Sequence, residues 1–166
     1  MSGDVDKLEA AAKDLEASGR LKILRRVEIP RISRDRVPAR AKKALIIDSE
    51  TTGLDVKTDH VIELGAVLVA YDRADGSIYG ALDIAGGFQD PGVPIPAEVT
   101  ALTGITDEMV RGQQLDLARF EALIAEADII VAHHAGFDRP IISKVLTSIR
   151  DKPWACSLTG VILVSV

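Results

Sequence analysis

The sequence has little cysteine, few aromatic residues and no long apolar run. Its single cysteine, Cys156, cannot form a disulfide within the chain, and a partly buried thiol is the simplest interpretation. Aromatic residues make up only 4% of the chain, so we expect an aliphatic core. No segment reaches the roughly 18 apolar residues of a membrane span, and the polar, acidic start is unlike a signal peptide. We therefore expect a cytoplasmic protein without membrane contact.

The charge is unevenly distributed along the chain. The net charge is −5 over 166 residues, yet residues 20–43 contain ten Lys or Arg against two acids, Glu28 and Asp35. A basic arm on an acidic body could hold polyanions near carboxylates. A solvated linker that is basic by chance explains the same composition equally well.

The first 43 residues are expected to form a helix followed by an extended connector. Apolar residues recur at helical spacing over 5–18, with Asp4 as N-cap and Gly19 as the stop. The connector is rich in Arg and interrupted by proline, which favours a segment that wraps the body over a second domain. We therefore divide the chain into residues 1–43 and a globular domain, 44–166.

The body begins with three predicted strands. An aliphatic run at 44–48 is followed by runs at 61–72 and 77–88, and Ala74-Asp75-Gly76 has hairpin-turn chemistry between the last two. These runs predict an antiparallel meander. The proline-rich residues 89–98 are expected to form a surface loop.

Helices and a further strand complete the predicted fold. Thr106 is a candidate N-cap for a short helical turn, and residues 115–127 have the apolar stripe of an amphipathic helix. The run ADIIVAHH then indicates a strand that enters the sheet parallel to the first through a crossover. A last helical face extends to about Arg150. The order β-β-β-α-β-α predicts an α/β fold with a mixed sheet flanked by helices.

Three acids are placed to share one metal site. Side chains two apart in a strand point to the same face, so Asp48 and Glu50 should project together. Asp138 follows the second parallel strand, and the carboxyl ends of parallel strands meet at one edge of a sheet. Carboxylate oxygens suit Mg²⁺ or Mn²⁺. A pair of such ions could activate water in phosphodiester cleavage.

Other interpretations of these residues stay open. The acid pair could simply solvate a strand end, and Asp138 could be the N-cap of the last helix. The neighbouring His133 and His134 face opposite ways on a strand, which favours structural roles. Thr51, Thr52 and Gly53 form a turn whose amides could approach a nucleotide, with Leu54 against a terminal base, although Gly53 alone would explain an ordinary turn.

At these residues the sequence resembles the DEDD 3′-to-5′ exonucleases, in the epsilon-subunit-like branch of the ribonuclease-H-like superfamily. The segments IIDSETTGLD (46–55) and HVIELGAV (60–67) resemble the first motif, and IVAHHAGFD (130–138) resembles the second. The segment PIPAEVTALTGITDEMV (94–110) is similar to the linker of the family. LEASGRLKILRR (15–26) is similar to an extension in some bacterial members.

The resemblance implies roles for particular residues. Asp48, Glu50 and Asp138 would be catalytic and hold two Mg²⁺ or Mn²⁺ ions. The substrate-binding residues would be Ser49, Thr51, Thr52, Gly53, Leu54, His134 and Phe137. His134 stands where the family usually has Asn. The substrate would be single-stranded or 3′-terminal DNA, with RNA not excluded, and a polymerase subunit is a candidate partner that the sequence itself does not reveal.

The C-terminal part departs from the family. Its third motif, a His followed five residues later by an Asp, is absent, because no histidine follows His134 and the only acid after Asp138 is Asp151. This pattern indicates a truncated exonuclease domain with impaired activity. A missing helix would also leave a sheet face uncovered, through which the chain could self-associate.

Two further functions compete with a 3′-to-5′ exonuclease. The first is a non-catalytic remnant that binds nucleic acid or a polymerase through the basic arm and the first two motifs. The second is a regulatory interaction module unrelated to nucleic acid, for which the basic arm would be dispensable.

Overall fold

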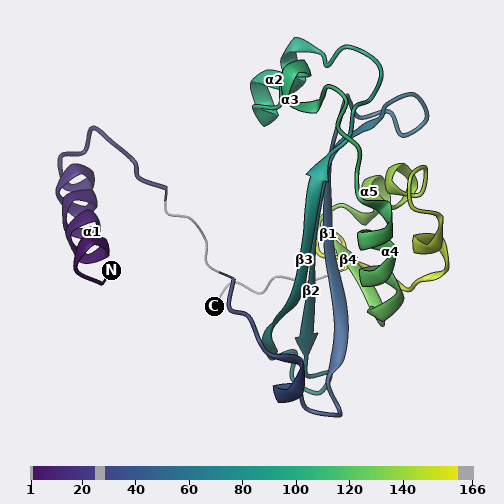
Figure 1. The fold of residues 1–166 in the computed structure, drawn as a ribbon, viewed down its shortest axis with the longest axis horizontal. Helices are drawn as coiled ribbons and strands as arrows, with labels where there is room; N and C mark the ends of the chain where they lie inside the picture. Colours follow the sequence, from purple (N-terminus) through teal and green to yellow (C-terminus); the bar gives the residue numbers. More distant parts are fainter. Residues whose placement is uncertain (1, 25–28, 161–166) are drawn as a thin grey trace.

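The computed structural model describes residues 2–24 and 29–160. They form a five-stranded mixed sheet in the order β3-β2-β1-β4-β5, flanked by helices (Figure 1). This confirms the predicted fold class. In the described part of the chain, no helix is long and apolar enough to cross a membrane.

The first three strands are the predicted meander. β1 (Lys42–Thr51) pairs antiparallel with β2 (Val61–Tyr71), which pairs antiparallel with β3 (Ile78–Phe88). The β2–β3 turn contains Gly76 at φ 76°, a conformation that favours glycine. β1 extends three residues beyond the predicted run, so Asp48 and Glu50 lie within the strand.

The parallel part of the sheet follows α4 (Leu117–Glu126), which crosses over to β4 (Ile129–Ala132). β4 pairs parallel with β1, and the short β5 (Trp154–Cys156), which the periodicity did not predict, pairs parallel with β4. Cys156 is half-buried, as expected.

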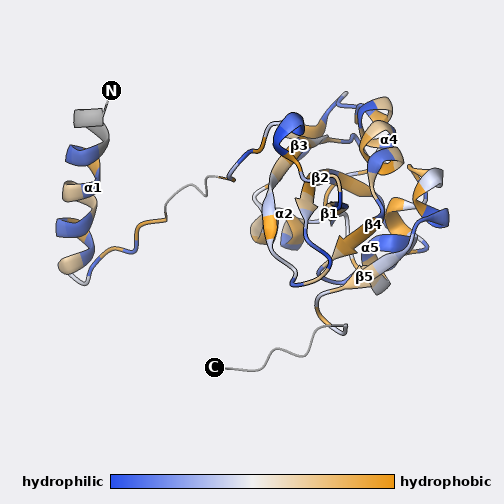
Figure 2. Cartoon of the chain, turned by 90° about the horizontal axis from the view of Figure 1, so that it is seen from below, coloured by the Kyte–Doolittle hydropathy of each residue, from blue (hydrophilic) through white to orange (hydrophobic). Residues whose placement is uncertain are grey.

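The core lies between the sheet and the helices on one face. α4 and α5 (Ala135–Ile142) lie against one side of the strands, which are largely hydrophobic in colour in Figure 2. The largest fully buried side chains are aliphatic apart from Phe120, as the scarcity of aromatics indicates. On the opposite face Ile46 is 43% exposed and lines an apolar pocket with Val67 and Val69. Self-association through this open face stays a prediction.

Two smaller helices cover the end of the sheet (Figure 1). α2 (Ala97–Thr103) was not expected, because its first residues belong to the proline-rich segment. α3 (Asp107–Val110) begins at the predicted N-cap, where the Thr106 side chain accepts a hydrogen bond from the Met109 amide.

The predicted helix to Arg150 is wrong. α5 ends at Ile142, and a separate 3₁₀ helix, η2, covers Thr147–Asp151. The Ser143 hydroxyl donates to the Arg139 carbonyl, and Arg150 donates to the Ser143 carbonyl. These side chains satisfy carbonyls at the end of the helix, so the backbone turns away there.

The N-terminal segment consists of α1 (Ser2–Ala17), a connector and η1 (Arg34–Arg36). α1 starts earlier than predicted, so Asp4 lies inside it and is not its N-cap, whereas Gly19 follows its end at φ 69°. The predicted helix is thus confirmed but its cap is wrong.

The connector is attached to the edge of the sheet at β3. The Ile32 amide donates to the Ala81 carbonyl at 3.0 Å, and the Ala81 amide donates to the Pro30 carbonyl at 2.8 Å. Gly80 permits this approach, because a Cβ there would lie 3.1 Å from the Ile32 Cβ, and its φ of 145° favours glycine.

Several basic side chains of the segment 20–43 are paired with acids of the body. The ion pairs are Arg34–Glu126, Arg40–Asp72, Lys42–Asp128 and Lys43–Glu126. Exposed pairs of this kind contribute little stability each, but they place the connector on the body. These four cations are therefore not freely available to a polyanion.

Candidate active site

The site is built where β1 runs beyond the end of β4. β4 pairs with β1 only from Ala44 to Ile46, so the remainder of that edge of β1 is open. α5 begins directly after β4 and brings Asp138 to this open edge. Asp138 therefore meets β1 at Ser49, between Asp48 and Glu50, although β1 extends well beyond the end of β4.

Asp48 and Glu50 share one pocket on the face of the sheet opposite α4 and α5. The pocket has a volume of about 210 Å³ and is also lined by Glu63 and Gly65 of β2. The strand register places Glu63 directly opposite Glu50, and Gly65 opposite Asp48. The absence of a side chain at Gly65 leaves room beside Asp48.

Glu63 also lines this candidate site, and the sequence pattern does not predict it. It lies near the start of the otherwise apolar strand β2, and the cross-strand register brings it to Glu50. Burial raises the pKa of Glu50, and the charges of Asp48, Glu63 and Asp138 raise it further. A carboxyl group with other carboxylates nearby ionises most easily when a cation is bound beside it.

Asp138 is buried and contacts β1 through the side chain of Ser49. Its side chain is 3% exposed, and the Ser49 hydroxyl donates a hydrogen bond of 2.8 Å to its Oδ1. Burial raises the pKa of Asp138; the Ser49 hydrogen bond opposes this, and the charge of Asp48 adds to it. Asp138 is not the N-cap of α5, since His134 occupies that position.

The charges of the three predicted acids thus influence one another, but their side chains do not converge on one metal position. Within residues 2–24 and 29–160, no three His, Cys, Asp or Glu side chains are placed to hold a metal ion as they stand. The donor set nevertheless fits hard divalent cations, because Asp48, Glu50 and Glu63 share a pocket that contains no basic residue.

A second pocket, largely apolar, adjoins the carboxylates through Glu50. Its volume is about 480 Å³. It is lined by predicted residues of the turn and by residues of α2, namely Glu50, Thr51, Thr52, Gly53, Leu54, Glu98, Val99, Leu102 and Thr103. Leu54 and Leu102 are 86% and 87% exposed, so both present apolar surface to an incoming group. The α2 residues were missed because α2 itself was not predicted.

The two remaining predicted residues lie elsewhere. The rings of His134 and Phe137 stack with centroids 6.1 Å apart, and neither side chain lines the pocket beside Glu50. His133 bonds through Nδ1 to the Ser157 hydroxyl at 2.9 Å, which agrees with a structural role.

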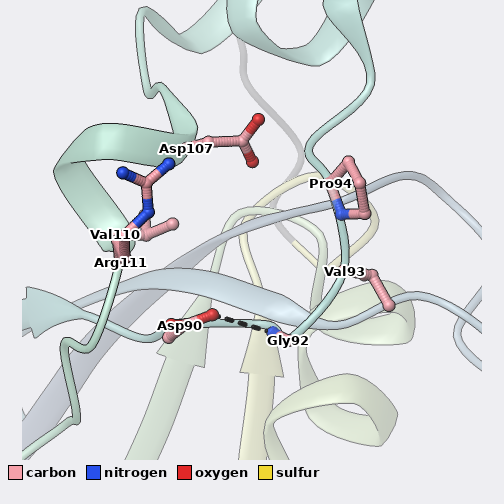
Figure 3. Close-up of a pocket in the computed structure, with 7 residues that line it drawn as sticks. All are labelled: Asp90, Gly92, Val93, Pro94, Asp107, Val110 and Arg111. Carbon is pink, nitrogen blue, oxygen red and sulfur yellow. Dashed lines mark hydrogen bonds between the residues drawn. The ribbon is translucent and has the colours of Figure 1, made fainter.

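A further pocket lies beside α3 (Figure 3) and contains none of the predicted residues. Asp90, which lines it, accepts hydrogen bonds from the amides of Gly92 and Gly112. Asp107 accepts one from the Ile95 amide. These carboxylates are used to fix loops, so we do not assign the pocket a ligand.

Comparison with known proteins identifies the family. Residues 45–160 match the family model RNase_T, described as an exonuclease. The chain is 41% identical over 105 residues to the PolC-type DNA polymerase III of Clostridium perfringens, covering 61% of this chain and 7% of the polymerase. It is also 41% identical over 101 residues to the corresponding protein of Listeria welshimeri, covering 59% and 6%.

A solved structure agrees in fold. The zinc-bound complex of E. coli exonuclease I with single-stranded DNA has a TM-score of 0.56 and 17% sequence identity, and the match covers 70% of this chain and 28% of that one. At this identity the likeness establishes the fold alone. The chain spans less than a tenth of the length of the polymerases it matches.

Proposed function

The chain belongs to the RNase_T exonuclease family, and from this premise we propose that it removes nucleotides from the 3′ end of DNA by hydrolysis with two divalent cations. The family itself has a ribonuclease-H-like fold and nuclease activity on nucleic acids. The direction of cleavage, the DNA substrate and the two-ion mechanism are our proposal.

One observation carries the proposal. Glu50 lines both the carboxylate pocket and the apolar pocket, so a cation and a nucleotide would meet at this residue. Asp48 and Glu50 would hold the cations, with Asp138 as a third acid behind Ser49. When bound, divalent cations would supply activation of water and stabilisation of the departing oxygen.

The chain's own residues would position the terminal nucleotide. Leu54 and Leu102 offer apolar surface for a base, and the amides of the turn at Gly53 offer donors to the sugar or phosphate. Thr51 and Thr52 are buried beneath this turn, so they would support it more than touch the substrate. His134 and Phe137, which do not line this pocket, would contact nucleotides further from the 3′ end of the nucleic acid.

We expect residues 1–166 by themselves to hydrolyse the nucleic acid slowly. The third motif of the exonucleases that the sequence resembles, a His followed five residues later by an Asp, is not in this sequence. The histidine that would act as general base is therefore missing from it. A positioned general base contributes typically 10²–10⁴-fold in rate. This same observation favours the second candidate function, a non-catalytic domain that binds nucleic acid or a polymerase.

Degradation of end-labelled single-stranded DNA separates the two functions. With Mg²⁺ or Mn²⁺ and a 5′ label, the exonuclease gives a ladder that shortens from the 3′ end, whereas a 3′ label is released as mononucleotide at once. The ladder should vanish with Asp48→Ala. Binding of the DNA without any cleavage, by a folded chain, would support the non-catalytic function, and a labelled RNA of the same sequence tests the preference for DNA.

A further inference from the structure

The two ends of the loop between β1 and β2 are joined by hydrogen bonds between Thr52 and His60. The Thr52 amide donates to the His60 carbonyl at 2.9 Å, and the His60 amide donates to the Thr52 hydroxyl at 3.0 Å. The loop carries Gly53 and Leu54 into the pocket beside Glu50. Its conformation therefore decides how these two residues meet a ligand.

The Asp59 carboxylate occupies the inside of this loop. Its Oδ1 accepts a hydrogen bond of 2.9 Å from the Thr52 hydroxyl, and its Oδ2 accepts one of 2.8 Å from the Asp55 amide. Gly53 packs directly against it, since a Cβ at Gly53 would lie 2.5 Å from Oδ2. The carboxylate thus fixes the residues on both sides of Leu54.

The same loop is tied to the helix that carries Asp138. Lys144, two residues after the end of α5, donates from Nζ to the Asp59 carbonyl at 2.8 Å and to the Lys57 carbonyl at 3.2 Å. These two hydrogen bonds hold the loop against the segment that follows α5, on a side of the loop away from the pocket residues of α2.

We propose that Asp59 is a positioning residue that sets the affinity of the pocket for a nucleoside 5′-monophosphate, the unit at the 3′ end of a nucleic acid. It acts through Gly53 and Leu54 and does not touch the cations. This inference rests on the proposed function. It adds a residue whose role is confined to holding the nucleotide-binding turn.

The test compares Asp59→Ala and Asp59→Asn with the unmodified chain. Titration with dTMP in the presence of Mn²⁺ should show about tenfold weaker binding for Asp59→Ala, because the loop loses preorganisation that binding must then restore. Asp59→Asn retains one acceptor oxygen and should recover part of the loss. Mn²⁺ binding without dTMP should stay within about twofold in both. Asp75→Ala is the matched control, since its carboxylate accepts a hydrogen bond from the Ser77 amide in the β2–β3 turn, which is not part of this loop.

The outcomes separate this inference from the proposed function. If the unmodified chain binds Mn²⁺ but no dTMP, both fail. If it binds dTMP and Asp59→Ala binds it equally well, only the inference fails. Equal losses of Mn²⁺ and dTMP binding in Asp59→Ala would also overturn the inference, because they would indicate general disruption.

A double variant checks the contact on which the inference depends. Gly53→Ala should lower the melting temperature of the unmodified chain, because the new methyl group meets the Asp59 carboxylate. In the Asp59→Ala background the same substitution should have little effect. Equal decreases in the two backgrounds would show that Asp59 does not pack against Gly53, and would overturn the inference.

Discussion

The Ser49 hydroxyl donates a hydrogen bond of 2.8 Å to Oδ1 of Asp138 and so joins β1 to α5. Ser49 lies between Asp48 and Glu50 in sequence but points to the opposite face of the sheet. The strand therefore presents two carboxylates on one side and holds a third through the intervening hydroxyl. In the proposed site, both sides of β1 would therefore contribute.

Ser49→Ala should weaken cation binding. Without the hydroxyl, the pKa of Asp138 rises further, because the hydrogen bond stabilises the charged form. We expect a loss of about tenfold in Mn²⁺ affinity, the size of one hydrogen bond to a charged group. Isothermal titration measures it, with Ser157→Ala as the control serine. Unchanged affinity would indicate that Asp138 does not take part.

Cation affinity should depend on pH. The pKa values of Glu50 and Asp138 are raised above their ordinary values of 4.5 and 3.8, chiefly by burial. Mn²⁺ requires the charged forms, so its affinity should decrease as the pH is lowered through the range just above these ordinary values. In the metal-free protein, these two groups should contribute more stability as the pH is lowered over the same range, since the folded state holds their protons more tightly than the unfolded state. Titrations from about pH 7.5 to about pH 5 test this, and constant affinity would contradict it.

Asp72 should stabilise the fold at neutral pH. The Ala74 amide, the Tyr79 hydroxyl and Arg40 lower its pKa from 3.8 to about 2. The contribution is fully present above the unfolded value of 3.8 and is lost as the pH falls toward 2. Asp72→Asn should therefore lower the melting temperature near pH 7, with a smaller difference near pH 3. A difference that is independent of pH would exclude this charge as the cause.

Leu102→Ala should reduce nucleotide binding without destabilising the fold. Its side chain is 87% exposed, so its removal leaves no cavity in the free protein. Burial of about half of a leucine side chain by a base is worth about 1 kcal/mol, or roughly fivefold in dTMP affinity. Leu117→Ala, an exposed leucine of α4, should have no effect. If both variants bind dTMP equally well, α2 does not form part of the pocket.

The sequence predicts the strands and their order because long apolar runs and a helical crossover allow few arrangements. It does not predict β5, since the three residues Trp154–Cys156 are too short to show a period. It also misses Glu63, whose position opposite Glu50 depends on the register of β1 and β2 and not on spacing. Likewise, the pairing of Arg34 and Lys43 with Glu126 joins residues more than 80 positions apart.

The most direct test of the central claim is Mn²⁺ binding by the unmodified chain and by Asp48→Asn, with Asp75→Asn as a control that removes the same charge elsewhere. The account predicts that Mn²⁺ binds to the unmodified chain and to Asp75→Asn, and that its affinity decreases at least tenfold in Asp48→Asn while the fold persists. Equal binding by all three proteins would contradict the assignment of Asp48 and Glu50 as the cation site.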